Sequence, residues 1–165
     1  MENNVKRNMF IENATISCRN FSGRIDEYNT KGERNFLLNL TDDQAEEMIE
    51  RGWNVKQWPA RDGEEKGGYF IRVALRFDPY PPSVFLLNGK KKIRLTEETI
   101  DQLDWTEIET LDIMLTSYRW THMNRSGIKV VVKSMMVTPI MDEMAAKYAY
   151  LDYPEEDATD SDAPF

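Results

Sequence analysis

The chain has 165 residues, 41% of them hydrophobic and 30% charged, which suffices for one folded domain with a core and a short appendage. No apolar run approaches the roughly 20 residues that a membrane-spanning helix requires, and the first residues lack the apolar stretch of a signal peptide. Cys18 is the only cysteine, which excludes an intrachain disulfide and a zinc site made of several cysteines. We expect a cytosolic protein that contacts no membrane.

The net charge of −8 is concentrated at one end of the sequence. Residues 152–165 contain six acids and no base, which leaves 23 acids against 21 bases in the rest of the chain. A block of like charge with few apolar residues does not bury enough surface to fold, and it commonly serves as an interaction tail. We therefore predict a flexible N-terminal arm at 1–13, a folded domain at 14–151 and a disordered acidic tail at 152–165.

A β-hairpin is predicted at the start of the folded domain. Its first strand is expected over 15–28, where a switch in the parity of the apolar residues near Asn20 indicates a bulge. A turn at 29–32 and a second strand at 35–40 complete the hairpin.

A short helix is predicted to follow this hairpin. The hydroxyl of Thr41 can cap its first turn, and Gln44 three residues later completes a capping box. Gly52 is a suitable residue to end the helix. An extended segment at 53–58 and a polar loop at 59–68 come next.

The second half of the domain is also predicted to be rich in strands. Residues 69–77 alternate clearly between two faces, and Asn88-Gly89 is a strong signal for a hairpin turn. The expected elements are strands at 69–77, 84–87, 93–95, 108–121 and 128–138, and short helices at 96–103 and 140–151. Short strands, hairpins and two or three short helices indicate a mostly β domain, but periodicity alone does not distinguish a barrel from a sandwich.

The acidic tail ends in Pro164-Phe165. A terminal carboxylate and an aromatic ring form a compact anchor for an apolar pocket flanked by Arg or Lys. The upstream acids, Asp157, Asp160 and Asp162 among them, would steer this anchor towards basic partners. A random polar terminus is the alternative, and the Pro-Phe ending favours the interaction tail.

Several stretches of the body, together with this tail, resemble a group of phage single-stranded DNA-binding proteins. The matching stretches are Arg19-Asn-Phe-Ser-Gly23, Tyr28-Asn29, Gly32-Glu-Arg-Asn-Phe36, Gly52-Trp-Asn-Val-Lys56, Leu103-Asp-Trp105 and Ile108-Glu109. The resemblance implies an OB-fold-like five-stranded barrel, elaborated here with extra hairpins and short helices. It also implies sequence-independent binding of single strands during replication or recombination in the cytoplasm of an infected bacterium, with phage or host proteins recruited by the tail.

The strand at 69–77 offers the best candidate surface for a single strand. Such binding requires cations for phosphates and aromatic rings for bases. Phe70, Arg72 and Arg76 supply both on the face opposite the apolar residues. An ordinary solvated strand face is the alternative, although an exposed Phe between two arginines is less usual there.

Other basic and aromatic residues are candidate DNA contacts as well. They are Arg34, Trp53, Lys56, Trp58, Lys90, Lys91, Lys92, Arg94, Tyr118, Trp120, Lys129 and Lys133. The lysine run is equally well explained as a solubilising charge run. Tyr118 and Trp120 fit a core position slightly better than a surface one, and of Trp53 and Trp58 we expect one to be buried.

The sequence gives little support to an enzyme. His122 is the only histidine and is expected in a turn, and phosphate-loop, nucleophile-elbow and zinc-protease motifs are missing. Acids such as Asp26, Glu27 and Asp112 could hold Mg²⁺, but their spacing is not diagnostic. We expect no cofactor and no resident metal. An acidic DNA mimic that binds a host protein is the main alternative, and the sequence is compatible with a homodimer without fixing the oligomeric state.

Overall fold

The computed structural model describes residues 7–148. The predicted acidic tail and residues 1–6 of the predicted N-terminal arm lie outside these residues. Within the rest of that arm, Met9–Ile11 form a strand that pairs with Ile113–Leu115. Within them, none of the helices is both long and apolar enough to cross a membrane.

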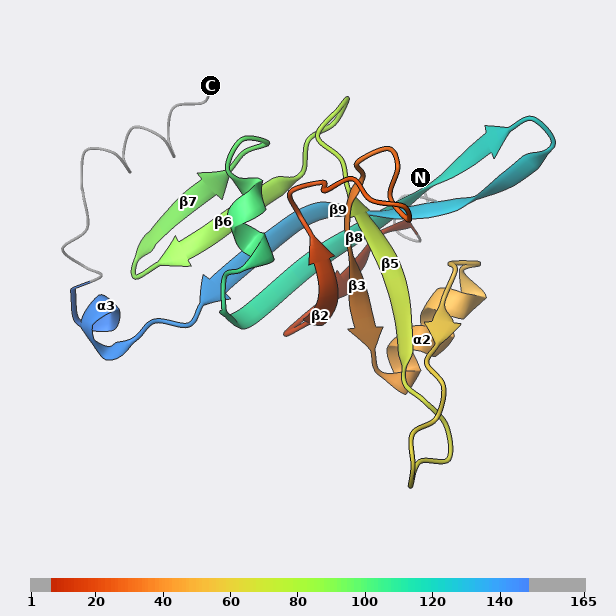
Figure 1. Cartoon of the computed structure of the whole chain (residues 1–165), viewed down its shortest axis with the longest axis horizontal. Coiled ribbons are helices and arrows are strands. Elements are labelled where there is room, and N and C mark those ends of the chain that lie inside the picture. Colours follow the sequence, from red (N-terminus) through yellow and green to blue (C-terminus); the bar gives the residue numbers. More distant parts are fainter. Residues whose placement is uncertain (1–6, 149–165) are drawn as a thin grey trace.

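Nine strands form one mixed sheet in the described part of the chain (Figure 1). Their bounds are β1 Met9–Ile11, β2 Thr15–Asn20, β3 Arg34–Leu40, β4 Lys56–Gln57, β5 Tyr69–Leu75, β6 Ser83–Asn88, β7 Lys91–Leu95, β8 Ile108–His122 and β9 Arg125–Pro139. The order along the sheet is β1-β8-β9-β5-β3-β2, with β4 beside β5, β6 beside β9 and β7 beside β6. β5 and β6 run parallel to β9, and the other pairs are antiparallel.

The two end strands of this order are neighbours in the sequence. Only residues 12–14 separate β1 from β2, and the amide of Ala14 donates to the carbonyl of Leu111 in β8 at 2.6 Å. The sheet therefore curves round so that its ends approach each other. This arrangement is consistent with an OB-like fold, but the predicted closed five-stranded barrel is not shown, because residues 7–148 contain no ladder between β1 and β2.

The concave side of the sheet carries the core. Alternate residues of β5, namely Ile71, Val73 and Leu75, are at most 2% exposed, which confirms the predicted alternation. Phe21 and Phe36 are fully buried and stack with ring centroids 5.4 Å apart. Each such side chain contributes about 1.5–3 kcal/mol by leaving water. We call this side the inner face and the opposite side the outer face.

Local signals predicted the first helix correctly. Helix α2 spans Asp42–Glu50, and Thr41 and Gln44 form the predicted capping box. Gly52 follows with a φ of 85°, a left-handed conformation that glycine adopts without steric cost.

The later helices begin after their predicted starts. The segment expected to be helical from residue 96 is a turn followed by the short 3₁₀ helix η1, Ile100–Asp104. The hydroxyl of Thr99 accepts a hydrogen bond from the amide of Thr96 at 2.8 Å, which stabilises that turn. Helix α3 spans Glu143–Tyr148 instead of starting at residue 140, where the amide of Ile140 is still bonded to the carbonyl of Glu107.

The first long strand was predicted eight residues too long. β2 ends at Asn20 because the carboxylate of Asp104 accepts hydrogen bonds from the amides of Phe21 and Ser22, at 2.5 and 3.1 Å. Residues 21–33 then form a loop, here called the β2–β3 loop. The predicted bulge near Asn20 is confirmed by a register shift between Ser17 and Asn20.

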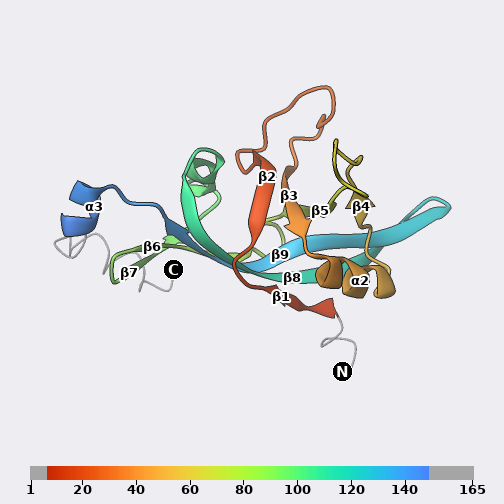
Figure 2. The same cartoon turned by 90° about the horizontal axis from the view of Figure 1, so that it is seen from below.

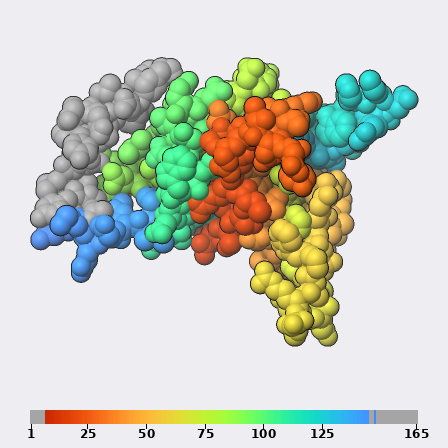
Figure 3. Space-filling view, in the orientation of Figure 1, coloured from red at the N-terminus to blue at the C-terminus, as the bar shows by residue number. Residues whose placement is uncertain are grey.

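β8 and β9 form a long antiparallel hairpin, as predicted, with a tight turn at Met123-Asn124. Its far end, residues 118–129, is here called the distal hairpin. Figures 1, 2 and 3 show it projecting from the body, at the opposite end of the molecule from β6 and β7. Residues 119–126 are all exposed.

Candidate nucleic-acid interface

Strand register brings most of the predicted contact residues to the outer face. Residues paired across a ladder project to the same side of a sheet. Lys56 pairs with Phe70, and Ala74 pairs with Val131. On β8, Tyr118 pairs with Lys129. The resulting outer-face set contains Lys56, Trp58, Phe70, Arg72, Tyr118, Trp120 and Lys129, with Arg76 just beyond the end of β5.

An aromatic pair marks one end of this set. The rings of Trp58 and Phe70 stack with centroids 4.1 Å apart, and Trp58 remains 40% exposed. The amide of Trp58 donates to the carbonyl of Gly68 at 2.8 Å, which closes the 59–68 loop. A Cβ on Gly67 would lie 1.9 Å from the carbonyl oxygen of Trp58, so only glycine allows this close approach. The contacts of Trp58 with Gly67 and Gly68, where the 59–68 loop closes, therefore position the Trp58 ring.

The two tryptophans of this segment have different environments, as expected. Trp53 is 5% exposed and belongs to the core, with the guanidinium of Arg51 5.5 Å from its ring. Trp58 is the exposed one. The buried ring of Trp53 is therefore not available to stack on a base.

Arg72 lies exposed at the middle of the outer face. Its guanidinium donates to the side-chain oxygen of Asn35 at 3.2 Å, and Asn35 itself is only 7% exposed. Leu37, opposite Arg72 in β3, is 5% exposed although it is on the outer face. The long stem of an arginine can cover such apolar surface while its charged end stays in water.

The distal hairpin continues the outer face away from the body. The guanidinium of Arg76 donates to the hydroxyl of Tyr118, and Lys129 forms an ion pair with Glu33 of the β2–β3 loop. Trp120 is 37% exposed and Tyr118 is half-buried. The preference for a core position was therefore wrong for Trp120, and Tyr118 lies on the outer face as well.

Gly127 leaves room for the Trp120 ring. The two residues pair across the hairpin, and a Cβ on Gly127 would lie 2.9 Å from three atoms of the indole. The indole thus lies directly over the glycine backbone. The packing of an aromatic ring over a cross-strand glycine is a known way to stabilise an exposed hairpin.

The hairpin of β6 and β7 presents a second aromatic and basic cluster. Lys92 and Arg94 lie 4.5 and 5.5 Å from the ring centroid of Phe85. Phe85 pairs with Met136 of β9, which extends the outer face to this hairpin. Lys90 is exposed at the turn, and Lys91 is half-buried beside it. Lys133 is exposed on β9, at the register shift between Leu115 and Met114 of β8.

The side chain of Arg34 makes contacts within the protein. Its guanidinium donates to the carbonyl of Phe21 at 2.9 Å, lies 5.6 Å from the ring centroid of Phe77 and is 3.9 Å from Glu97. These contacts tie the start of β3 to the β2–β3 loop. Its side chain is 22% exposed.

Comparison with known proteins now assigns the chain to a family. A family model described as "Putative phage ssDNA-binding domain" matches residues 1–164. The chain belongs to this family. The resemblance found in the sequence is thereby confirmed, whereas no curated protein matches the chain.

Solved structures of a single-stranded DNA-binding protein from bacteriophage Enc34 have a similar fold. Its complex with ssDNA has a TM-score of 0.54 at 10% identity, over 82% of this chain and 88% of that one. Another structure of the Enc34 protein gives a TM-score of 0.52 at 10% identity, over 88% and 90% of the two chains. A C-terminal truncation gives 0.52 at 8% identity, over 82% and 87%. At such low identity the similarity concerns the fold alone.

Three residues of this family member's outer face escaped the sequence analysis. His122 and Arg125 pair at the end of the distal hairpin, on the same side as Trp120 and Gly127. The turn is two residues long, so His122 is the last residue of β8 and not a loop residue. Phe85 was missed because the run Val-Phe-Leu-Leu at 84–87 is apolar on both faces.

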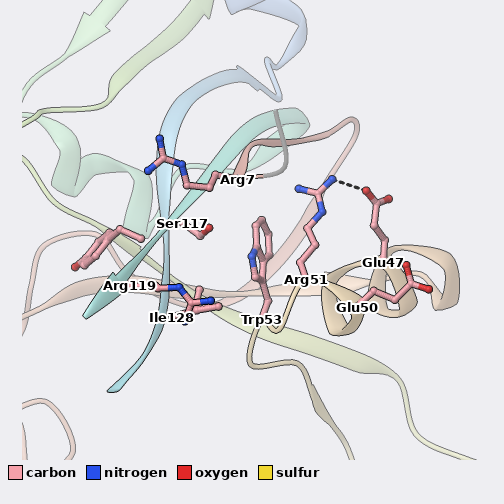
Figure 4. A pocket seen from close by; sticks show the side chains of 9 residues that line it. Arg7, Glu47, Glu50, Arg51, Trp53, Ser117, Arg119 and Ile128 are labelled. Atoms are coloured by element: carbon pink, nitrogen blue, oxygen red, sulfur yellow. Dashed lines mark hydrogen bonds and ion pairs between the residues drawn. The ribbon is translucent and has the colours of Figure 1, made fainter. Parts of the chain in front are cut away.

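A cavity of about 860 Å³ lies on the inner side of the distal hairpin (Figure 4). Arg51 reaches into it, where the guanidinium contacts Glu47 at 2.5 Å and donates to the carbonyl of Asn8 at 2.8 Å. Through these contacts Arg51 links α2 to the residue that precedes β1. The cavity is lined by Arg7, Glu47, Glu50, Arg51, Trp53, Ser117, Tyr118, Arg119 and Ile128. Over residues 7–148, no three His, Cys, Asp or Glu side chains gather as a metal site would require.

Proposed function

We propose that this protein binds single-stranded DNA without sequence preference, through the outer face from Trp58 to the distal hairpin. The observation that carries the proposal is the shared face of aromatic rings and cations set by the strand register. In OB folds the face of the second and third strands, with the adjoining loops, is the usual surface for oligonucleotides. Family membership and the fold shared with the Enc34 protein, whose structure with ssDNA is known, support it.

The chemistry of this face suits a flexible single strand. Arg72, Arg76 and Lys129 supply positive charge for phosphates, and Lys56 lies beside the aromatic pair. The Trp58–Phe70 pair and Trp120 offer ring faces on which bases stack. Because every base has a π face, stacking selects single strands over duplex without reading sequence.

The cluster on β6 and β7 provides a second stretch of the same interface. Lys90, Lys92, Arg94 and Lys133 are exposed, and Phe85 lies between two of these cations. Lys91 is half-buried and adds positive charge near the turn. A strand long enough to follow β9 would reach both clusters.

We further propose that the acidic tail recruits phage or host replication and recombination proteins in the infected cell. Six acids and the Pro164-Phe165 ending make it suited to a basic partner with an apolar pocket. The acids would also compete with DNA phosphate for the protein's own cations.

A fluorescence titration with labelled oligo-dT at several salt concentrations tests the proposal. Log affinity should fall linearly with log salt, by about 0.7 per phosphate neutralised. Duplex of the same length should bind more weakly. Equal or stronger binding to duplex would refute the proposal, and no binding at low salt would favour the acidic DNA mimic. In the same titration Trp120→Ala should bind more weakly than the parent protein, because a stacking ring is lost. Trp105→Ala is a suitable control, because Trp105 is 69% exposed and precedes β8.

A further inference from the structure

Glu33 forms an ion pair with Lys129, one of the cations of the outer face. It belongs to the β2–β3 loop, and its carboxylate pairs with the ammonium group of Lys129, 96 residues away in sequence. The two side chains are 31% and 32% exposed, respectively. The pair is therefore accessible to ions and ligands from solution.

The loop holds the backbone of Glu33 in place. Its amide donates to the side-chain oxygen of Asn29 at 2.9 Å, and the side-chain nitrogen of Asn29 donates to the carbonyl of Glu33 at 2.9 Å. Asn29 also donates to the carbonyl of Arg24 at 2.8 Å. These hydrogen bonds fix the backbone of Glu33, and its carboxylate contacts Lys129 from there.

Lys129 lies among groups that favour an anion. It pairs across the hairpin with Tyr118, whose hydroxyl accepts a hydrogen bond from Arg76. Carboxylate and phosphate oxygens make the same kind of charge-assisted hydrogen bond to an ammonium group. The carboxylate of Glu33 therefore takes the place that a phosphodiester oxygen would take at Lys129.

We propose that Glu33 is an internal substitute for a DNA phosphate, which a bound strand displaces from Lys129. This inference rests on the proposed function of the outer face. Partly exposed ion pairs contribute little to stability, so their exchange is easy. The freed carboxylate then repels the phosphate and attracts a cation from solution. Glu33 thereby weakens binding and reduces its dependence on salt.

Glu33→Gln tests this directly, with Glu27→Gln as the matched control. Glu27 is an exposed acid of the same loop, so both variants remove one negative charge. Glu33→Gln should bind oligo-dT about two- to fivefold more tightly at low salt, the range of an exposed ion pair. Its salt slope should be steeper by up to about 0.7, the contribution of one phosphate. Glu27→Gln should stay close to the parent protein in both respects.

A double-mutant cycle with Lys129→Gln shows whether Glu33 acts through Lys129. In the Lys129→Gln background, Glu33→Gln should no longer increase affinity, because the site it occupied is gone. Weaker binding by Glu33→Gln would mean that the ion pair is a structural brace, and an equal gain with Glu27→Gln would mean a general charge effect. Either result overturns the inference. Failure of the parent protein to bind oligo-dT would instead refute the proposed function, and circular dichroism establishes that each variant is folded.

Discussion

Replacing Gly127 with alanine should impair DNA binding by displacing Trp120. The added Cβ would lie 2.9 Å from the indole atoms Cε2, Cζ2 and Nε1, so the ring has to move. Gly127 lies within β9 and has no positive φ, so its backbone tolerates alanine. Alanine in a strand is more favourable than glycine by about 0.5–1 kcal/mol, which should offset the lost packing. We expect little change in the free energy of unfolding.

The loss of affinity should be bounded by that of Trp120→Ala. Removing one stacked aromatic costs about 1–3 kcal/mol, or roughly 5- to 150-fold in affinity. Gly127→Ala keeps the ring but moves it, so its loss should be smaller than this. Trp120→Ala and the double variant should bind alike, since the alanine at 127 acts only through the ring.

Titration with oligo-dT measures these affinities, and Gly68→Ala is the matched control. A Cβ on Gly68 would meet no atom within 4 Å, and its φ is not in the left-handed region. Its affinity should equal that of the parent protein. Parent-like binding by Gly127→Ala would show that Trp120 is no stacking platform, and a further loss on adding Gly127→Ala to Trp120→Ala would refute the steric explanation.

Three further predictions concern other parts of the molecule. Phe70→Ala should lose roughly 1–3 kcal/mol of oligo-dT binding, whereas Arg72→Ala should reduce the slope of log affinity against log salt. Both predictions would be contradicted if the variants unfold and the fraction that stays folded binds like the parent protein. Asp104→Ala should destabilise the fold by roughly 2–4 kcal/mol in urea denaturation, because it removes the acceptor of two backbone amides from a side chain that is 3% exposed; an unchanged midpoint would be evidence against this. Deleting 152–165 should raise affinity for oligo-dT at low salt, and Phe165→Ala should reduce partner capture from infected cells without changing that affinity; unchanged capture would mean that the Pro-Phe ending is incidental.

Features governed by neighbouring residues could be predicted from the sequence. The capping box of Thr41 and Gln44 depends on residues three apart. The hairpin signalled by Asn88-Gly89 depends on adjacent residues, and it forms with Gly89 and Lys90 in the turn and Asn88 as the last residue of β6. The alternation along β5 likewise follows from the two-residue period of a strand. The family was also recognisable, because short stretches of sequence and the acidic tail carry its pattern.

Features governed by distant partners were decided only by the tertiary structure. β2 stops at Asn20 because Asp104, more than 80 residues away, takes the amides that would continue the ladder. Trp53 is buried and Trp58 exposed, although they are five residues apart, because Trp53 belongs to the core cluster while Trp58 stacks on Phe70. The Lys129–Glu33 pair has the same origin, since the curved sheet brings a loop near residue 33 to the distal hairpin. Local sequence periodicity determines which face a residue occupies, but the register and curvature of the sheet determine what it meets there.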